Sequence, residues 1–232
     1  MAERPMTVFL AGDSTMSEKA ADKRPETGWG EFLQGYFPVD RVRVENHAQN
    51  GRSTRTFLSE GRWQAILDRL RPGDYVFIQF GHNDQPKEKV DRHTPPEQYR
   101  QNLTRFVQDA RATGATPVLL TPVMRRRFDA EGNVEDSHAQ YPDLVRAVAQ
   151  ATSSPLIDMH RASERVLQQY GVEESKRLFL WLGPHENPNY PDGIEDNTHF
   201  SPLGAEEMAA LAVEGIRRLG LGLADHLQPA AE

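Results

Sequence analysis

The sequence contains no cysteine and no long apolar run. The first absence excludes disulfides, thiolate metal sites and a cysteine nucleophile. No segment approaches the ~18 apolar residues that a membrane-spanning helix needs, and the apolar stretch near the N-terminus, of about six residues, is too short for the hydrophobic region of a signal peptide. We therefore expect no membrane partner and a cytoplasmic location for the sequence as it stands, or secretion if a leader has been removed.

Positive charge is the minority charge. The chain carries 27 Lys and Arg against 34 Asp and Glu, which gives a net charge of −7. A negative balance offers no general attraction for DNA, RNA or an anionic membrane surface. We therefore expect no nucleic-acid partner, and no feature of the composition specifies an oligomeric state.

The remaining composition is that of a globular protein. Hydrophobic residues make up 38% of the 232, and the 17 glycines bring the apolar fraction close to the ~45% typical of folded domains. The length favours one large domain over two. We expect a single domain over residues 1–232, with a core from about residue 6 to 219 and a loosely held tail after Gly220.

Short runs rich in β-branched residues alternate along the chain with segments of helical periodicity. Strands are predicted at residues 6–11, 42–46, 74–80, 116–121 and 155–159, and helices at 56–70, 95–113, 141–151 and 202–219. This alternation predicts an α/β protein with helices on both faces of a parallel sheet. The expected architecture is a three-layer α/β/α sandwich around a flavodoxin-like five-stranded parallel sheet.

Local signals define some boundaries. Thr94, followed by Pro95 and Glu97, predicts a capping box with proline at the first helical position, and Gly114 predicts the end of that helix. Ser201 is the expected N-cap of the last helix. Residues 183–199 are dense in Pro, Asn, Asp and Gly, and they are predicted to form a long functional loop.

Polar residues follow the first three predicted strands. In open parallel sheets, ligands bind outside the carboxyl ends of the strands. Ser14 follows the first strand, Gly51 the second and Asn83 the third. If the strand order is 2-1-3-4-5, the three loops lie side by side.

Each of these residues has two interpretations. Ser14 is either a nucleophile or the cap of a helix. Gly51 either lets a backbone N–H approach a ligand closely or supplies a positive φ to a turn. Asn83 either donates its amide to an oxyanion or takes part in turn chemistry.

A serine nucleophile also needs a base, because its hydroxyl is weakly reactive until a neighbour accepts the proton. Asp196 and His199 lie three residues apart, so the carboxylate can accept from one imidazole nitrogen while the other faces Ser14. Taken alone, this spacing is common. Combined with the three loops at one sheet edge, it favours a Ser-His-Asp enzyme.

These segments also carry a family resemblance. VFLAGDSTM at residues 8–16 resembles block I of the SGNH (GDSL-type) hydrolases, Asn50-Gly51 resembles block II, GHND at 81–84 block III, and residues 196–199 block V. The strings GDSTM, NHAQNGRSTRTF, FGHND and TPVMRRRF further resemble the rhamnogalacturonan acetylesterase branch. The resemblance extends from residue 8 to about 205, which is nearly the whole chain.

The resemblance implies the SGNH hydrolase fold and a role for each matching residue. Ser14 would be the nucleophile, His199 the general base and Asp196 its orienting carboxylate. The N–H groups of Ser14 and Gly51 and the side chain of Asn83 would form the oxyanion hole. The implied activity is that of a serine esterase, a carboxylic ester hydrolase that removes O-acetyl groups from rhamnogalacturonan or its oligosaccharides through an acyl-enzyme.

Arginines near the same sheet edge suggest how an acidic pectic substrate could bind. Guanidinium groups bind carboxylates bidentately, as galacturonate would require. The candidates are Arg52, Arg55, Arg125, Arg126 and Arg127. Ordinary solvated or structural charges are the alternative. Trp181, expected in the long loop, could stack on a sugar, whereas Trp29 and Trp63 are expected in the core.

Other functions remain open at this point. An SGNH esterase could instead act on acetylated xylan or on a lipid or thioester acyl chain, and a flavodoxin-like binding module would have no catalysis at all. His82, Asp84 and His93 raise the idea of a metal site, but their spacing matches no zinc motif. We expect neither a metal nor another cofactor.

Overall fold

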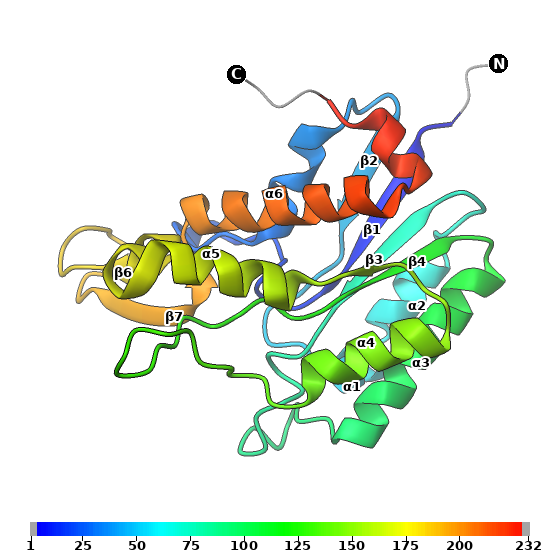
Figure 1. Cartoon of the computed structure of the whole chain (residues 1–232). Helices are drawn as coiled ribbons and strands as arrows, with labels where there is room; N and C mark the ends of the chain where they lie inside the picture. The colour runs from blue at the N-terminus through cyan, green and yellow to red at the C-terminus, as the bar shows by residue number, and fades with distance from the viewer. Residues whose placement is uncertain (1–3, 229–232) are drawn as a thin grey trace.

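A five-stranded parallel sheet forms the centre of the computed structural model, which describes residues 4–228 (Figure 1). Its strands are β1 (Met6–Gly12), β2 (Val42–Asn46), β3 (Tyr75–Gln79), β4 (Thr116–Leu120) and β5 (Leu156–Ile157). The order is β2-β1-β3-β4-β5, and every pair is parallel. The predicted α/β fold with flavodoxin-like strand order is confirmed.

Helices cover both faces of this sheet. One face packs on α5 (Met159–Glu174) and α6 (Pro202–Leu219), and the other on α1 (Thr54–Ser59), α2 (Arg62–Leu67), α3 (Pro96–Ala112) and α4 (Tyr141–Ala151). All five residues of β3 are buried because both faces are covered. Trp29 and Trp63 lie in the cores of opposite faces, as expected.

Short 3-10 helices complete the structure: η1 (Ala21–Lys23), η2 (Trp29–Glu31), η3 (Leu33–Tyr36), η4 (Ser175–Leu178) and η5 (Gly222–His226). The last of these buries Leu223 completely, so the expectation of a loose tail directly after Gly220 is wrong. Residues 229–232 of that tail lie outside the described residues. Within residues 4–228, no helix is long and apolar enough to cross a membrane.

The predicted loop at residues 183–199 is wrong in its second half. Residues Ile194–Phe200 form strand β7, which pairs antiparallel with β6 (Phe179–Leu182). The apolar pairs Leu182↔Ile194 and Phe179↔Phe200 fix this hairpin, while the residues between them are polar and hide the strand in the sequence. The hairpin lies beyond the carboxyl ends of the main strands (Figure 1).

Two helix predictions also needed correction. The helix expected at 56–70 is two helices, because Gly61 adopts a left-handed conformation (φ 72°) between α1 and α2. Pro95, not Thr94, is the N-cap of α3, and no side chain caps that end. The N–H of Thr94 instead donates to the Asp84 carbonyl. Ser201 caps α6 as predicted, accepting from the N–H of Gly204.

Gly28 fixes the segment before η2 against the turn that follows β1. A Cβ at residue 28 would lie 2.0 Å from the carbonyl oxygen of Ser17. We expect Gly28→Ala to lower the free energy of unfolding by about 3 kcal/mol, the upper part of the overpacking range, because the clash is with backbone. Gly35→Ala is the matched control, since nothing lies within 4 Å of a Cβ there. Equal denaturation midpoints for the two variants would contradict the prediction.

Candidate active site

Ser14 lies on a tight turn at the carboxyl end of β1. The Asp13 carboxylate accepts hydrogen bonds from the N–H and the hydroxyl of Thr15, at 2.9 and 2.8 Å. The Asp13 carbonyl accepts from the N–H groups of Met16 and Ser17. These bonds fix the turn so that the Ser14 side chain points away from the sheet, and only 6% of Ser14 is exposed.

A chain of hydrogen bonds joins this serine to β7. The Ser14 Oγ lies 2.9 Å from Nε2 of His199, and Nδ1 of His199 lies 2.7 Å from Oδ2 of Asp196. The other Asp196 oxygen accepts from the N–H groups of Thr198 and His199. With the Nδ1 proton donated to Asp196, Nε2 is left as the acceptor for the serine proton. The structure therefore brings the three predicted residues together.

The charges around His199 make it a stronger base than an isolated imidazole. Burial alone would lower the pKa of His199, but the hydrogen bond and charge of Asp196, helped by the charge of Glu26, raise it above its ordinary value. For Asp196 the effect of burial has the opposite sign. Burial raises the pKa of this carboxyl group, but the hydrogen bonds and charge of His199 lower the pKa by more. Asp196 is thus ionised wherever His199 is neutral.

The expected oxyanion donors lie at the same edge. Within the described chain, the backbone N–H groups of Ser14 and Gly51 donate to no acceptor. Gly51 has a φ of 75°, which suits glycine and sets the direction of its loop. The Asn83 amide donates one hydrogen to the Arg52 carbonyl at 3.1 Å, which leaves its second hydrogen available. The three loops are therefore held side by side.

A buried lysine connects two of these loops, and sequence reasoning missed it. The Lys19 ammonium is fully buried, donates to the Ser14 carbonyl and to Oδ1 of Asn50 (2.7 Å), and forms an ion pair with Glu26 at 3.0 Å. Burial lowers the pKa of Lys19 despite the opposing charge of Glu26. In the sequence this lysine stands in a polar stretch, where it resembles a solvated charge.

The third loop is held by a buried carboxylate. Oδ1 of Asp84 accepts from the N–H and hydroxyl of Thr54, at 2.9 and 2.6 Å, which connects the loop after β3 to the start of α1. Burial raises the pKa of Asp84 to about 7. Nδ1 of His93 donates to the Asp84 carbonyl at 2.7 Å, and the His82 ring packs on His138. Asp84 and His93 therefore have structural roles. Within residues 4–228, the structure does not bring His82, Asp84 and His93 together as ligands of one metal ion.

The two arginines after Gly51 are engaged within the protein. Nε of Arg52 pairs with Glu60 at 2.9 Å, and Nη1 of Arg52 donates to the Asn50 carbonyl. Arg55 donates to the carbonyl of Val90 at 2.9 Å. These contacts support the interpretation of Arg52 and Arg55 as structural charges.

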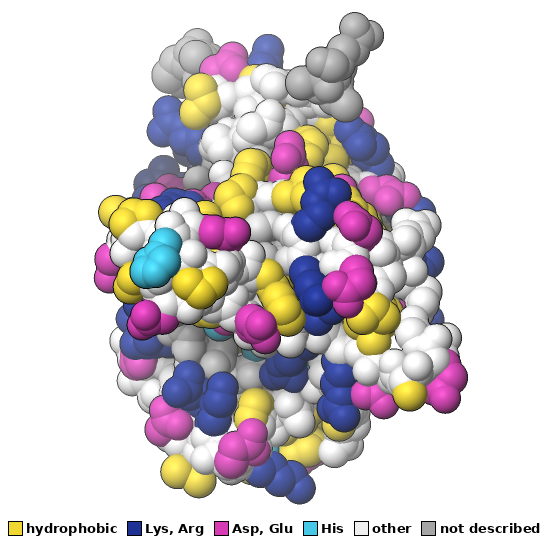
Figure 2. Space-filling view, turned by 90° about the vertical axis from the view of Figure 1, so that its left-hand side faces the viewer, with side chains coloured by type: hydrophobic (Ala, Val, Ile, Leu, Met, Phe, Trp, Pro, Cys, Tyr) yellow, Lys and Arg dark blue, Asp and Glu magenta, His cyan; other side chains and the backbone are white. Residues whose placement is uncertain are grey.

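The arginines at 125–127 line one cleft, together with Lys89 and Asn197. Arg125 is mostly buried and donates to the carbonyls of Ser137 and His82, so it is mainly structural. Arg126 donates to Oδ1 of Asn197. Arg127 is the exposed member, with a single ion pair to Glu135. On the side of the molecule shown in Figure 2, lysine and arginine side chains gather in the lower half of the view, below the β6–β7 hairpin.

Trp181 lies on β6, and it is not part of a loop. Its Nε1 donates to Oδ1 of Asn197 at 3.0 Å, and the cations of Arg126 and Lys176 lie 5.1 and 4.8 Å from its ring. These contacts join Trp181 to Asn197 of β7 and to two cations. The structure therefore favours a role for Trp181 in positioning β7 over stacking on a sugar.

Arg92 is a second residue that the sequence did not indicate. Its Nη1 lies 3.4 Å from Oδ1 of Asn83 and 3.1 Å from where a Cβ on Gly51 would be. A guanidinium therefore borders two of the expected oxyanion donors. No motif surrounds Arg92, so only the fold reveals its place.

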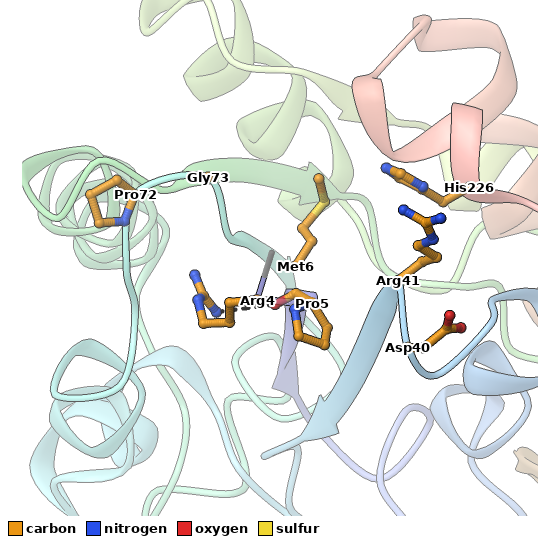
Figure 3. Close-up of a pocket in the computed structure, with 8 residues that line it drawn as sticks. All are labelled: Arg4, Pro5, Met6, Asp40, Arg41, Pro72, Gly73 and His226. Carbon is orange, nitrogen blue, oxygen red and sulfur yellow. Dashed lines mark hydrogen bonds between the residues drawn. The ribbon is translucent and has the colours of Figure 1, made fainter. Parts of the chain in front are cut away.

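Another cavity lies at the opposite end of the sheet. Figure 3 shows it at the amino ends of β1 and β2, with Met6 and Arg41 among its lining residues. The carboxyl end of β1, where Ser14 lies, is remote from it along the strand. This cavity contains none of the predicted site residues.

The sheet order, the Ser14 turn and the hydrogen-bonded Ser-His-Asp chain define an acylhydrolase of the SGNH type, a carboxylic ester hydrolase. The chain belongs to the GDSL-like Lipase/Acylhydrolase family, which matches residues 10–206. All the segments that carry the site fall inside this range.

Known proteins agree with this assignment. The chain is 49% identical to rhamnogalacturonan acetylesterase RhgT of Bacillus subtilis over 98% of this chain and 96% of that protein. The crystal structure of YxiM from Bacillus subtilis has a TM-score of 0.80 at 26% identity, covering 94% of this chain and 58% of that one. Axe2, an acetylxylan esterase from Geobacillus stearothermophilus, has a TM-score of 0.65 at 21% identity, covering 95% and 96%, and this likeness shows the fold alone.

The charge of Glu26 should be visible in the pH dependence of hydrolysis. His199 must be neutral to accept a proton, so kcat/KM should rise with a midpoint above about pH 6.5, because the pKa of His199 is raised. Glu26→Gln removes a negative charge that raises this pKa, so the midpoint should move to lower pH. Glu97→Gln, an exposed change on α3, is the control and should leave the midpoint unchanged. If the midpoint of Glu26→Gln lies at or above that of the parent, the result contradicts the assignment of His199 as a general base whose pKa Glu26 raises.

Proposed function

We propose that this protein is a serine esterase that removes O-acetyl groups from rhamnogalacturonan or from its oligosaccharides. The observation that carries the proposal is the hydrogen-bonded chain from Ser14 through His199 to Asp196, beside two uncommitted backbone N–H groups. The 49% identity with RhgT over almost the full length supports the substrate class.

The site geometry supports acyl transfer in two stages. His199 accepts the Ser14 proton while Oγ attacks the acetyl carbonyl, and the N–H groups of Ser14 and Gly51 with the Asn83 amide stabilise the oxyanion. His199 then gives the proton to the sugar oxygen as it leaves. In the second stage His199 deprotonates water, which attacks the acetyl carbonyl; the bond to Ser14 Oγ breaks, His199 returns the proton to Oγ, and acetate leaves.

The positively charged cleft is the proposed site for a galacturonate carboxylate. Lys89, Arg126 and Arg127 bring three cations beside Asn197, which lies between Asp196 and His199 on β7, and these cations outnumber the one carboxylate of the lining, that of Glu88. A protein with a net charge of −7 repels acidic polymers at long range, so a local cluster of this kind is needed to bind them. Arg127 is the best candidate for direct contact because its guanidinium is exposed.

Variants at the nucleophile and at the oxyanion donor test the reaction. Ser14→Ala should abolish acetate release from 4-nitrophenyl acetate, with an unchanged circular dichroism spectrum. Asn83→Ala should lower kcat by about 10²–10³ with a smaller effect on KM, because an oxyanion exists only in the transition state. Near-parent turnover in Ser14→Ala would overturn the assignment of the nucleophile.

A substrate comparison tests the specificity. Acetate release should be faster from acetylated rhamnogalacturonan than from acetylated xylan or a short-chain lipid ester at matched ester concentration. Arg127→Gln should lower kcat/KM about tenfold on rhamnogalacturonan, the loss of one charge-assisted contact, and leave 4-nitrophenyl acetate unaffected. Arg100→Gln, an exposed change on α3, is the matched control.

The results of these two experiments distinguish the proposed rhamnogalacturonan specificity from the alternatives. A preference for xylan or the lipid ester would move the protein to another acyl esterase specificity within the family. Equal loss on both ester classes in Arg127→Gln would contradict a contact with the carbohydrate.

A further inference from the structure

A cluster of two histidines and a carboxylate lies behind the third loop, apart from Ser14, Asp196 and His199. Asp136, His138 and His160 each place one ligand-type atom within 4.8 Å of the others. His138 is fully buried, His160 is almost so, and the Asp136 side chain is half exposed. The cluster therefore has a protein side and a solvent side.

The three residues are held in place by backbone contacts. Oδ1 of Asp136 accepts from the N–H of His138 at 3.0 Å and lies 3.1 Å from Nε2 of His160. The N–H of His160 donates to the Thr121 hydroxyl at 2.8 Å, at the start of α5. Two distant segments thus present their donors to each other in a fixed arrangement.

One ring nitrogen of the cluster lacks a partner. Nε2 of His138 is buried and makes no hydrogen bond within the described residues, whereas Nδ1 lies 3.2 Å from the Ser137 hydroxyl. The His82 and His138 rings meet edge to face at a centroid distance of 4.5 Å. A buried polar atom without a partner costs about 1–3 kcal/mol, so Nε2 of His138 is a candidate ligand atom.

We propose that Asp136, His138 and His160 bind a divalent transition-metal ion. Two imidazole nitrogens and one carboxylate are donors that suit first-row ions such as Zn²⁺, Co²⁺ and Ni²⁺. Bonds of about 2.0–2.1 Å to such an ion place its ligand atoms a little over 3 Å apart, which the 3.1 Å between Asp136 and His160 already satisfies. A fourth ligand, such as water, would reach the ion from the exposed side of Asp136.

The surrounding charges permit a cation. The positive charge of Arg125 is felt at His138 and opposes binding. On the His160 side, the charges of Asp136 and Asp158 favour a cation, and the charge of Arg146 opposes it. The proposed ligands are one carboxylate and two neutral imidazole rings. Binding of the ion would therefore need no further negative charge from the protein.

The ion would have a structural effect on the third loop. It would join the segment that carries Asp136 and His138 to the start of α5, and the His138 ring packs on His82, which precedes Asn83. Metal binding should therefore raise the melting temperature. It supplies no group to the ester reaction, so this proposal does not depend on the proposed function.

Titration calorimetry with Zn²⁺ on chelator-treated protein tests the proposal. We expect one equivalent to bind, and Co²⁺ in its place to give the intense visible absorption of a site with nitrogen ligands and low coordination number. Asp136→Asn, a change at a half-exposed position, should weaken Zn²⁺ binding at least about tenfold, and His160→Gln should do the same. His185→Gln, at an exposed position on the loop between β6 and β7, should leave binding unchanged.

Two outcomes would overturn the site. One is the absence of stoichiometric Zn²⁺ binding by the parent protein. The other is binding that Asp136→Asn and His160→Gln leave intact, which would place the ion elsewhere. Hydrolysis of 4-nitrophenyl acetate, measured in parallel, reports on the ester reaction separately, and its loss in Ser14→Ala with retained Zn²⁺ binding would keep the two conclusions distinct.

Discussion

The hydrogen bond between Ser14 and His199 is the constraint on which the rest of the structure depends, because it joins residues 185 positions apart, one on the turn after β1 and the other on β7 of the second sheet. The serine is fixed by the turn that Asp13 closes at the end of β1. The histidine is fixed by β7, which pairs with β6 and, through Phe200, bridges to Thr27, and which lies outside the main sheet. A displacement of either element of about 1 Å would lengthen this bond beyond a useful distance.

The site is surrounded by buried ionisable groups that an ordinary core would not contain. Lys19 and Glu26 are both buried and paired, and Asp84 is buried with one oxygen bonded to Thr54 and the other without a partner among residues 4–228. Removing one member of a buried ion pair commonly costs about 3–5 kcal/mol, whereas apolar substitutes for both are often tolerated. Charge is therefore used here to connect the Ser14, Gly51 and Asn83 loops in one arrangement.

Local patterns in the sequence predicted the main sheet, and they pointed to Ser14, Asp196 and His199, which the structure brings together. Alternating strand and helix signals specify the parallel sheet, and Ser201 precedes α6 with an ordinary capping signal. β7 escaped because only its ends are apolar, and its pairing with β6 is a tertiary event. The burial of Lys19, the internal partners of Arg125 and the cluster at His138 arise from contacts between distant segments, which no local pattern records.

Arg126 connects the charged cleft to the β6–β7 hairpin. Its backbone N–H donates to the Asn197 carbonyl at 2.8 Å and its side chain donates to Oδ1 of the same residue, so the floor of the charged cleft and the strand that carries His199 are bonded to one another. If a sugar residue binds in this cleft, as proposed above, it contacts residues that are bonded to the strand that sets the position of the base. Binding energy from a remote part of the polymer can in this way appear as faster turnover instead of tighter binding.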